Sequence, residues 1–330
     1  MTSSAPASLS PFRLEPLFVE RIWGTADLRP WYDHVASGDP IGEVWLTGDK
    51  CRVLDGPLIG STLAEVFEKA PLAMVGLEAP AGGSPLLLKV ILAKEKLSVQ
   101  VHPDDRLAQK YGQPRGKTEC WYALAADPGA EVAAGLHPGV TLEQVEREVA
   151  DGTLEQSLEV LPVSAGEMVF VDAGTVHAIW PGSVLLETQQ NSDITYRLFD
   201  YGRPRELHVA KALEAIRPQT GAGKVAPVTL TDRTILVDRD YFCVEKIKVD
   251  ETRTAGTMVG ANEPTLGLAY LFAAAGSGRI TSLEQDGFEA VDLPTRGIVA
   301  VPASSPAWKI EDTGGLELIR ITPRWPKTTA

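Results

Sequence analysis

Residues 84–103 read SPLLLKVILAKEKLSVQVHP, two apolar runs that are each about the length of one β-strand. In the second run, two valines alternate with Gln100 and His102. Because side chains alternate across a strand, the amide and the imidazole share one face and the valines share the other. Pro103 lacks a backbone N–H, so we expect the strand to end there. This stretch predicts β-structure that carries polar side chains on one face.

Short β segments of this kind fill much of the chain, and helical patterns are fewer. Glycine and proline separate the segments, as in PIGEVWLTGD, GEMVFVDAG and DYFCVEKIKV. Helical patterns occur at residues 61–70, 141–152 and 205–218, and a threonine in a capping position opens each of the first two. Many short strands with few helices are typical of β-sandwiches and β-barrels. We therefore predict a mainly β fold with helical additions.

A domain boundary is predicted at residues 217–227, which read RPQTGAGKVAP. Small and polar residues, glycine and proline replace the periodic apolar pattern there. We expect a first domain over residues 1–220, which carries the catalytic and metal-binding groups, and a second β domain over residues 225–330.

The two domains contain segments that resemble each other weakly. VFVDAGTVHAI at residues 169–179 aligns with VAVPASSPAWKI at residues 299–310. In this alignment His177 falls on Ala307. A duplicated β unit whose second copy has lost its histidine would produce this pattern. We therefore expect the second domain to lack a metal site.

Composition narrows the class of partner. The chain has 330 residues and a formal net charge of −13, so we do not expect it to bind nucleic acid or an anionic membrane. No apolar run approaches the length of a membrane span, and the N-terminal MTSSAPASLSPF lacks the features of a signal peptide. The three cysteines are widely spaced, which is typical of a reduced protein. We expect a cytoplasmic protein, a monomer or weak homo-oligomer, that acts on a small molecule.

Four polar residues from separate β segments form a candidate metal site. They are Gln100 and His102, Glu119 in GKTECWY, and His177 in AGTVHAI. They can converge on one point if the strands curl into a barrel. Two imidazole nitrogens with carboxylate and amide oxygens suit a divalent ion, with Zn²⁺ favoured. The amide and the absence of cysteine from the set indicate an open, catalytic type of site.

Two cations stand in apolar strands. Lys89 interrupts LLLKVIL, and Arg197 lies within ITYRLFDY. A buried cation without a partner is costly, so each should meet a carboxylate or an anionic ligand. Together they would form the local positive site that an anionic substrate needs in an acidic chain.

The segments LSVQVHPDD, GKTECWY, AGTVHAI and YRLFDYGR together resemble the type I mannose-6-phosphate isomerases in their short bacterial form. The likeness extends from about Leu17 to the C-terminus, and PIGEVW also matches an early segment of the family. The resemblance implies two cupin-type β-barrel domains with added helices and one bound zinc. It also implies interconversion of mannose 6-phosphate and fructose 6-phosphate through an enediol.

The resemblance also implies roles for individual residues. The zinc ligands of the family fall on Gln100, His102, Glu119 and His177, and its substrate-pocket residues fall on Lys89, Ser98, Lys117 and Glu187. Its catalytic arginine falls on Arg197, and Glu187 or a water held by the metal is the candidate proton carrier. Lys89 and Ser98 suit the phosphate. Arg203 stands where long members have a lysine, and we expect it to bind substrate as well.

The chain departs from the family at two further points. Asp172 replaces a proline before the AGTxH turn, and the large helical domain of the long members is absent. The departures affect the expected substrate selectivity. The alternatives are another metal-dependent cupin, either an isomerase of a different sugar phosphate or an oxygenase, and a non-catalytic sugar-binding cupin. An oxygenase has no need of Lys89, Lys117 and Arg197, and a non-catalytic protein could have lost Glu119 or Arg197.

Overall fold

The computed structural model describes residues 8–76, 83–249 and 267–325. The chain divides into two compact units, which we treat separately. The first unit consists of residues 18–45 and 86–226. The second unit consists of the described residues within 1–17, 46–85 and 227–330.

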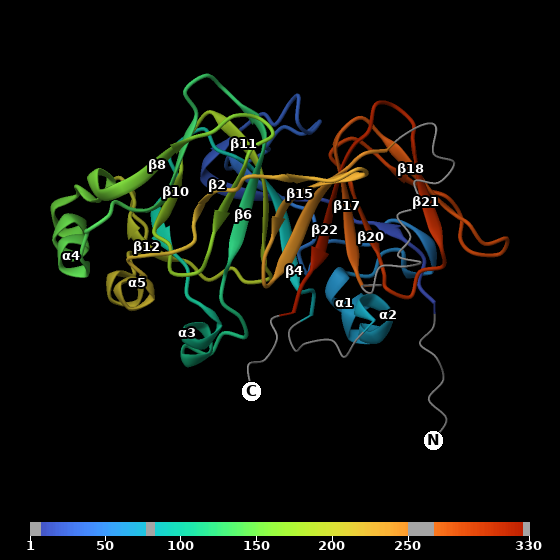
Figure 1. Ribbon diagram of the computed structural model, residues 1–330, viewed down its shortest axis with the longest axis horizontal. Helices are drawn as coiled ribbons and strands as arrows, with labels where there is room; N and C mark the ends of the chain where they lie inside the picture. The colour runs from blue at the N-terminus through green and yellow to red at the C-terminus, as the bar shows by residue number, and fades with distance from the viewer. Residues whose placement is uncertain (1–7, 77–82, 250–266, 326–330) are drawn as a thin grey trace. The chain divides into compact units, whose positions relative to one another are not determined.

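The first unit contains two antiparallel sheets, visible in Figure 1. The strands of the larger sheet are, in order, β13 (Gly223–Lys224), β9 (Met168–Val171), β6 (Glu119–Ala126), β11 (Ser183–Gln190), β4 (Leu86–Leu92), β3 (Ile41–Trp45) and β2 (Leu17–Thr25). Those of the smaller sheet are β12 (Tyr196–Phe199), β5 (Val99–Val101), β10 (His177–Ile179), β7 (Glu131–Leu136) and β8 (Leu158–Pro162).

Apolar side chains of both sheets form one core in the first unit. Trp23, Ile91 and Trp121 come from the larger sheet, and Val132 and Ile179 come from the smaller one. All five are at most 3% exposed. Burial of this apolar surface holds the two sheets face to face. The inner faces of the two sheets therefore lie opposite each other. Polar side chains on these faces can meet between the sheets.

A second core covers the other face of the smaller sheet. The valines of β5, Val99 and Val101, are fully buried in it together with side chains of α4 (Leu142–Asp151) and α5 (Val209–Ala215). Both helices lie beside this sheet in Figure 1. The valines therefore face the helices, and Gln100 faces the larger sheet. The alternation predicted for this strand is confirmed.

The helices of the first unit follow the capping signals of the sequence in part. The Thr141 side chain accepts a hydrogen bond at the start of α4, and Gly152 ends the helix at a φ of 71°, as the pattern at 141–152 predicts. α5 begins only at Val209, later than the pattern at 205–218 indicates. The sequence pattern also missed the short α3 (Asp105–Lys110), which is capped by Asp104.

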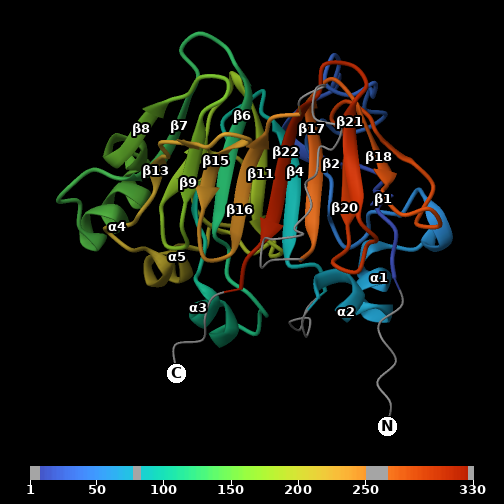
Figure 2. The same cartoon turned by 45° about the vertical axis from the view of Figure 1, so that its right-hand side comes forward.

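The second unit also contains two antiparallel sheets. The strands of the larger one are β1 (Phe12–Arg13), β20 (Ile298–Val301), β17 (Ala269–Ala275), β22 (Glu317–Pro323), β16 (Phe242–Ile247), β15 (Arg233–Asp238) and β14 (Val228–Thr229). The smaller one consists of β19 (Val291–Leu293), β18 (Gly278–Ser282) and β21 (Trp308–Asp312). In this sheet β17 pairs with β20 on one side and with β22 on the other, and all three strands are labelled in Figure 2.

The described residues within 46–85 belong to the second unit, although they precede the predicted boundary by more than a hundred residues. They form α1 (Leu63–Lys69) and α2 (Pro71–Val75). The last two carbonyls before Val75 accept hydrogen bonds from residues 304 and 303, at 3.0 and 2.9 Å. The chain therefore enters the second unit early and returns to it after residue 226. The assignment of catalytic and metal-binding groups to residues 1–220 stays a prediction.

The predicted mainly β fold with few helices is confirmed. In the described part of each unit the strands form two separate sheets, so neither unit is a single closed barrel. The two similar segments follow equivalent paths. Residues 169–179 run from β9 of a larger sheet to β10 of a smaller one, and residues 299–310 run from β20 to β21 in the same way.

The three cysteines are buried and free of disulfide bonds. Among the described helices, none combines the length and the apolar character that crossing a bilayer requires.

Candidate metal centre and active site

Three polar side chains lie in one row across the smaller sheet of the first unit. Gln100 of β5 is paired with His177 of β10 on one side and with Arg197 of β12 on the other. Because directly paired residues on adjacent strands point to the same face, all three face the larger sheet. There Glu119, the first residue of β6, meets them. His102, directly after β5, completes the group.

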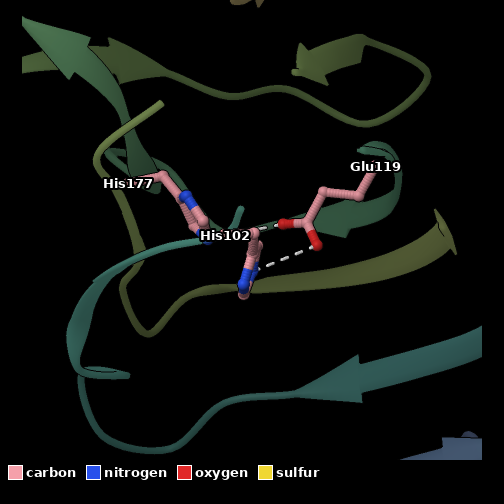
Figure 3. Close-up of side chains that lie close together, drawn as sticks. All are labelled: His102, Glu119 and His177. Carbon is pink, nitrogen blue, oxygen red and sulfur yellow. Dashed lines mark ion pairs between the residues drawn. The ribbon is translucent and has the colours of Figure 1, made fainter. Parts of the chain in front are cut away.

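The two histidines and the glutamate form a compact cluster (Figure 3). One ligand atom of each residue lies within 4.8 Å of the others. The Nε2 atoms of His102 and His177 are each 3.5 Å from a carboxylate oxygen of Glu119. All three residues are about 1% exposed. This arrangement can hold one metal ion, and the sequence prediction of a convergent His, Glu and His set is confirmed at this level.

Both imidazoles are held with Nε2 directed toward Glu119. Nδ1 of His102 donates to the carbonyl oxygen of Ile194 at 2.8 Å, and Nδ1 of His177 donates to that of Thr175 at 2.9 Å. A carbonyl only accepts, so each proton is on Nδ1 and each Nε2 carries a lone pair. Burial lowers the pKa of both rings, that of His177 to about 4, which keeps them neutral. Backbone-oriented neutral imidazoles of this kind are typical of metal ligands.

Gln100 lies beside the two imidazoles. Its amide nitrogen is 3.5 Å from Nε2 of His102 and 3.2 Å from Nε2 of His177, and Ser98 Oγ is 3.2 Å from its amide oxygen. The two ends of an amide have the same shape, and the hydroxyl of Ser98 can donate or accept. Turning the amide by 180° would therefore direct its oxygen toward the two Nε2 atoms. Gln100 is placed to serve as a fourth donor.

Burial of the Glu119 side chain disfavours its ionised form. Burial and the neighbouring carboxylate of Glu187 raise its pKa, and Lys117 opposes this with Nζ 2.8 Å from Oε2. The same Nζ is 3.0 Å from Nε2 of His102. A divalent cation between the carboxylate and the two Nε2 atoms would favour the ionised form further. The donor set therefore fits a metal ion chemically as well as geometrically.

The cluster borders a cavity of about 330 Å³ in the first unit. Charged side chains dominate its lining: Arg21, Glu43, Lys89, Lys117, Glu119, Glu187, Asp193, Arg197 and Arg205. Trp23, Ile91, Leu97 and Ile179 supply an apolar wall. Such a cavity, rich in convergent charges, suits a small, highly polar ligand.

Glu187 stands next to Lys89 at the floor of this cavity. The two residues are directly paired on β11 and β4, and Nζ lies 2.7 Å from Oε2. Burial alone would raise the pKa of Glu187, but Lys89 and Lys117 lower it to about 2. Trp121 Nε1 also donates to Oε1 at 3.2 Å. Glu187 is thus an ionised carboxylate in a buried site at neutral pH.

Arg197 has an incomplete set of partners. Nη1 donates to the carbonyl oxygen of Glu206 at 2.7 Å. Its Nε is buried and has no hydrogen-bond partner among the residues that the structure describes. Burial and the nearby Arg205 lower its pKa. Of the two predicted partners of Arg197, no carboxylate forms an ion pair with it among the described residues, and the anionic ligand stays a prediction.

The structure brings most of the predicted site residues together. The cavity is lined by Lys89, Ser98, Gln100, Lys117, Glu119, His177, Glu187 and Arg197. His102 adjoins it through the metal cluster. Arg203 is not part of the lining and instead pairs with Asp200 at 2.7 Å. The functional roles of these residues stay predictions.

Four charged lining residues, Arg21, Glu43, Asp193 and Arg205, went unassigned in the sequence. Glu43 lies in the PIGEVW segment and pairs with Arg21, with Oε2 and Nη2 3.0 Å apart. Arg205 follows Arg203 by two positions. The PIGEVW match to the family could have drawn attention to Glu43. Arg203 and Arg205 are two positions apart, so strand alternation could not tell which of them faces the cavity.

Comparison with known proteins extends these findings. The family model of the phosphomannose isomerase type I catalytic domain matches residues 12–125. A mannose-6-phosphate isomerase of Streptococcus mutans is 32% identical over 323 residues, which cover 92% of this chain and 97% of the relative. A probable mannose-6-phosphate isomerase of Bacillus subtilis is 36% identical over 255 residues, 72% of this chain and 80% of the relative.

A solved structure is similar over nearly the whole chain. The crystal structure of the mannose 6-phosphate isomerase from Bacillus subtilis matches with a TM-score of 0.82 and 30% sequence identity. The match covers 95% of this chain and all of that one.

Proposed function

This chain belongs to the type I phosphomannose isomerase family, and from that premise we propose that it interconverts mannose 6-phosphate and fructose 6-phosphate. The observation that carries the proposal is the cavity in which the candidate metal cluster, an ionised glutamate and several cations meet. An aldose–ketose isomerisation moves a proton between C1 and C2 through an enediol. It needs a polarised carbonyl, a positioned base and stabilisation of oxyanion charge, and the cavity offers a group for each.

Zinc is the metal that this donor set suits best. His102, Glu119 and His177 would hold it, and Gln100 would be a weaker fourth donor. Nitrogen and carboxylate donors without sulfur are typical of catalytic zinc sites with an open position. When bound, zinc supplies Lewis acidity that polarises the substrate carbonyl.

Glu187 is the best placed group in the chain to carry the proton between C1 and C2. Its carboxylate is ionised at neutral pH, as a base must be, and the ion pair with Lys89 and the bond from Trp121 fix its direction. Lys89 places a positive charge directly beside this carboxylate. Arg197 supports enediolate charge from the opposite sheet through its unengaged Nε.

Free, buried cysteines support a reducing location, and we infer that the enzyme acts in the cytoplasm on its sugar phosphate. A monomer or a weak homo-oligomer remains our expectation for its assembly.

The direct test is a coupled assay of the purified protein with mannose 6-phosphate. We expect turnover that a chelator abolishes and added Zn²⁺ restores. The variant His137→Ala is a matched control, because His137 is an exposed histidine outside the cavity and should leave turnover and its metal dependence unchanged. Absence of turnover in zinc-loaded wild-type protein would contradict the proposal.

A further inference from the structure

The turn that follows β12 brings two arginines to one buried carboxylate. Tyr201 and Gly202 both have positive φ, 55° and 78°, and the N–H of Arg203 donates to the carbonyl oxygen of Asp200 at 3.0 Å. Two successive residues with positive φ are the signature of a type I′ turn. The turn reverses the chain, so that the guanidinium groups of Arg203 and Arg205 both reach the side chain of Asp200.

Asp200 is 3% exposed and is shared by the two arginines. Arg203 donates to Oδ1 from Nη2 at 2.7 Å. Arg205 donates from Nε to Oδ2 at 2.7 Å and from Nη2 to Oδ1 at 2.6 Å, a two-point contact that fixes the plane of its guanidinium. Asp200 is therefore a clamp that holds both cations in defined positions.

The two arginines differ in what else they contact. The Nη2 of Arg203 also donates to the carbonyl oxygen of Lys96 at 2.8 Å, and its guanidinium lies over the ring of Tyr201 at 5.4 Å. These contacts occupy Arg203 within the fold. Arg205 lines the cavity instead, and among the described residues Asp200 engages only its Nε and Nη2. Its Nη1 is left for a ligand.

The charges of this part of the cavity do not balance. Each of the other lining cations has a carboxylate partner: Arg21 with Glu43 at 3.0 Å, Lys89 with Glu187 at 2.7 Å, and Lys117 with Glu119 at 2.8 Å. Among the described residues, Arg197, Arg203 and Arg205 have Asp200 as their one buried counter-charge; the other carboxylates that act on them, Glu95 on Arg203 and Glu206 on Arg197, are exposed. Arg205 is close enough to lower the pKa of Arg197. Asp193, the remaining carboxylate of the lining, acts on Lys89.

We propose that Arg205 binds the phosphate group of the sugar-phosphate substrate and that Asp200 is its positioning residue. The proposal rests on the proposed function and deepens it. The Nη1 of Arg205, which Asp200 does not engage, would donate a charge-assisted hydrogen bond to a phosphate oxygen, and the dianion would add negative charge beside this arginine. The contacts observed for Arg203 lie within the fold, and its predicted substrate contact stays a prediction. Arg205 would then select phosphorylated hexoses over free hexoses.

The test separates phosphate binding from catalysis. It measures kcat and KM for mannose 6-phosphate together with the inhibition constant of inorganic phosphate. We expect Arg205→Ala to raise both KM and that inhibition constant about 10- to 100-fold, the loss of a charge-assisted contact, and to change kcat less than about threefold. Arg147→Ala, an exposed arginine on α4, is the matched control and should change none of the three.

Asp200→Asn tests the positioning role. We expect a smaller rise of KM than in Arg205→Ala. We also expect the double variant Asp200→Asn/Arg205→Ala to bind inorganic phosphate no more weakly than Arg205→Ala alone, because the aspartate acts through the arginine. Additive losses in the double variant would overturn the positioning role of Asp200. Should Arg205→Ala fail to fold, Arg205→Lys keeps a positive charge but loses the two-point contact, and it must still raise KM at unchanged kcat.

The outcomes distinguish the two proposals. If wild-type protein turns over mannose 6-phosphate but the Arg205 variants keep wild-type KM and phosphate inhibition, the phosphate role is wrong and the isomerase function stands. If wild-type protein does not turn over mannose 6-phosphate, the function fails, and calorimetric titration with inorganic phosphate still decides whether Arg205 binds this anion. Weakened phosphate binding in Arg203→Ala alone would reverse the assignment of the two arginines.

Discussion

At the scale of single residues, the site depends on which atom of each side chain is left free. The backbone carbonyls of Thr175 and Ile194 take up the Nδ1 protons, so the two Nε2 lone pairs face Glu119. An imidazole bound in this way needs no rearrangement to accept a metal ion. The four predicted ligands also differ in strength. A neutral amide oxygen is a poorer donor than an imidazole or a carboxylate, so Gln100 should be the weakest of them.

Replacement of the metal ligands should reproduce this ranking. We expect His177→Ala or His102→Ala to abolish stoichiometric metal binding, because one imidazole, one carboxylate and a weakly donating amide would not hold zinc against a chelator. Gln100→Ala should weaken binding less. Metal analysis of the purified variants after dialysis measures the effect, with His137→Ala as the exposed control. Full zinc content in His177→Ala would show that the cluster is not the metal site.

Arg197 should matter more for rate than for binding. If its guanidinium stabilises enediolate charge, Arg197→Ala should lower kcat by about two to three orders of magnitude and leave bound zinc unchanged. Arg197→Lys keeps the charge but loses the planar fork, so we expect it to restore KM more than kcat. Steady-state kinetics of both variants decide the matter. A lysine variant with nearly wild-type kcat would make Arg197 a substrate clamp.

At the scale of elements, a tight turn sets the positions of the cations. The turn from Asp200 to Arg203 connects β12 to the segment before α5, and it uses two residues with positive φ. A left-handed conformation is unfavourable for any residue with a β-carbon. The fold therefore maintains strain at Tyr201 and relies on glycine at the next position.

Gly202→Ala should destabilise the protein by about 1 kcal/mol, because the added β-carbon disfavours its φ of 78°. Apart from its two chain neighbours, no described residue has a heavy atom within 4 Å of the position that this carbon would occupy, so the loss comes from the backbone conformation. Urea denaturation measures the change. Gly221→Ala is the control, because the φ of Gly221 is not positive. A β-carbon added there would lie 3.8 Å from the nearest atom, Oδ2 of Asp172. Equal stability of the two variants would contradict the turn argument.

At the scale of the whole molecule, the chain contributes to each unit more than once. Hydrogen bonds within the second unit join distant segments, such as Ser84 Oγ with Tyr270 OH at 2.9 Å, both fully buried. The backbone carbonyls of Ala73 and Met74 accept from the chain at residues 304 and 303. The second unit is therefore not a C-terminal addition that can be removed cleanly.

A fragment that ends at residue 226 should for this reason fold poorly. It retains residues 46–85 but removes the strands that complete their unit, so buried groups such as Met74 and Ser84 lose their partners. We expect low solubility and binding of a hydrophobic dye, with a lower Tm than that of the full chain. A soluble fragment with the Tm of the full chain would instead support a simple division at residues 220–225.

Acid should destabilise the full chain through its paired carboxylates. Burial alone would raise the pKa of Glu43, Asp55 and Asp200, but the cations beside them lower it in each case. A carboxyl whose pKa is lowered in the folded state stabilises the fold fully at a pH above its pKa in the unfolded chain, about 4. This contribution is lost as the pH falls through the lower pKa of the folded state. We expect Tm to fall steeply below about pH 4.

The control for this pH effect is an exposed ion pair. Asp27 pairs with Arg29 in water, so Asp27→Asn should leave the acid transition unchanged, whereas Asp200→Asn should flatten it. A Tm that is constant between pH 5 and pH 3 would show that these buried pairs do not control acid stability.

Much of the site was predictable from the sequence because its information is local. Alternation along residues 97–102 put Gln100 and His102 on one face, and this follows from strand geometry alone. The motif residues Glu119, His177 and Arg197 were likewise identified as a site by residue type and by family resemblance. The mainly β class followed from the number of short apolar runs.

Only the tertiary structure decided what depends on pairing between distant segments. The register that sets His177 and Arg197 on either side of Gln100 comes from three strands that are not adjacent in the sequence. The choice of Arg205 over Arg203 as a cavity residue depends on a turn and on Asp200. Residues 46–85 join the second unit through contacts with residues more than 180 positions away. The reason is physical: local pattern determines which face a side chain takes, but the register and contacts of strands far apart in the chain are set by packing in three dimensions.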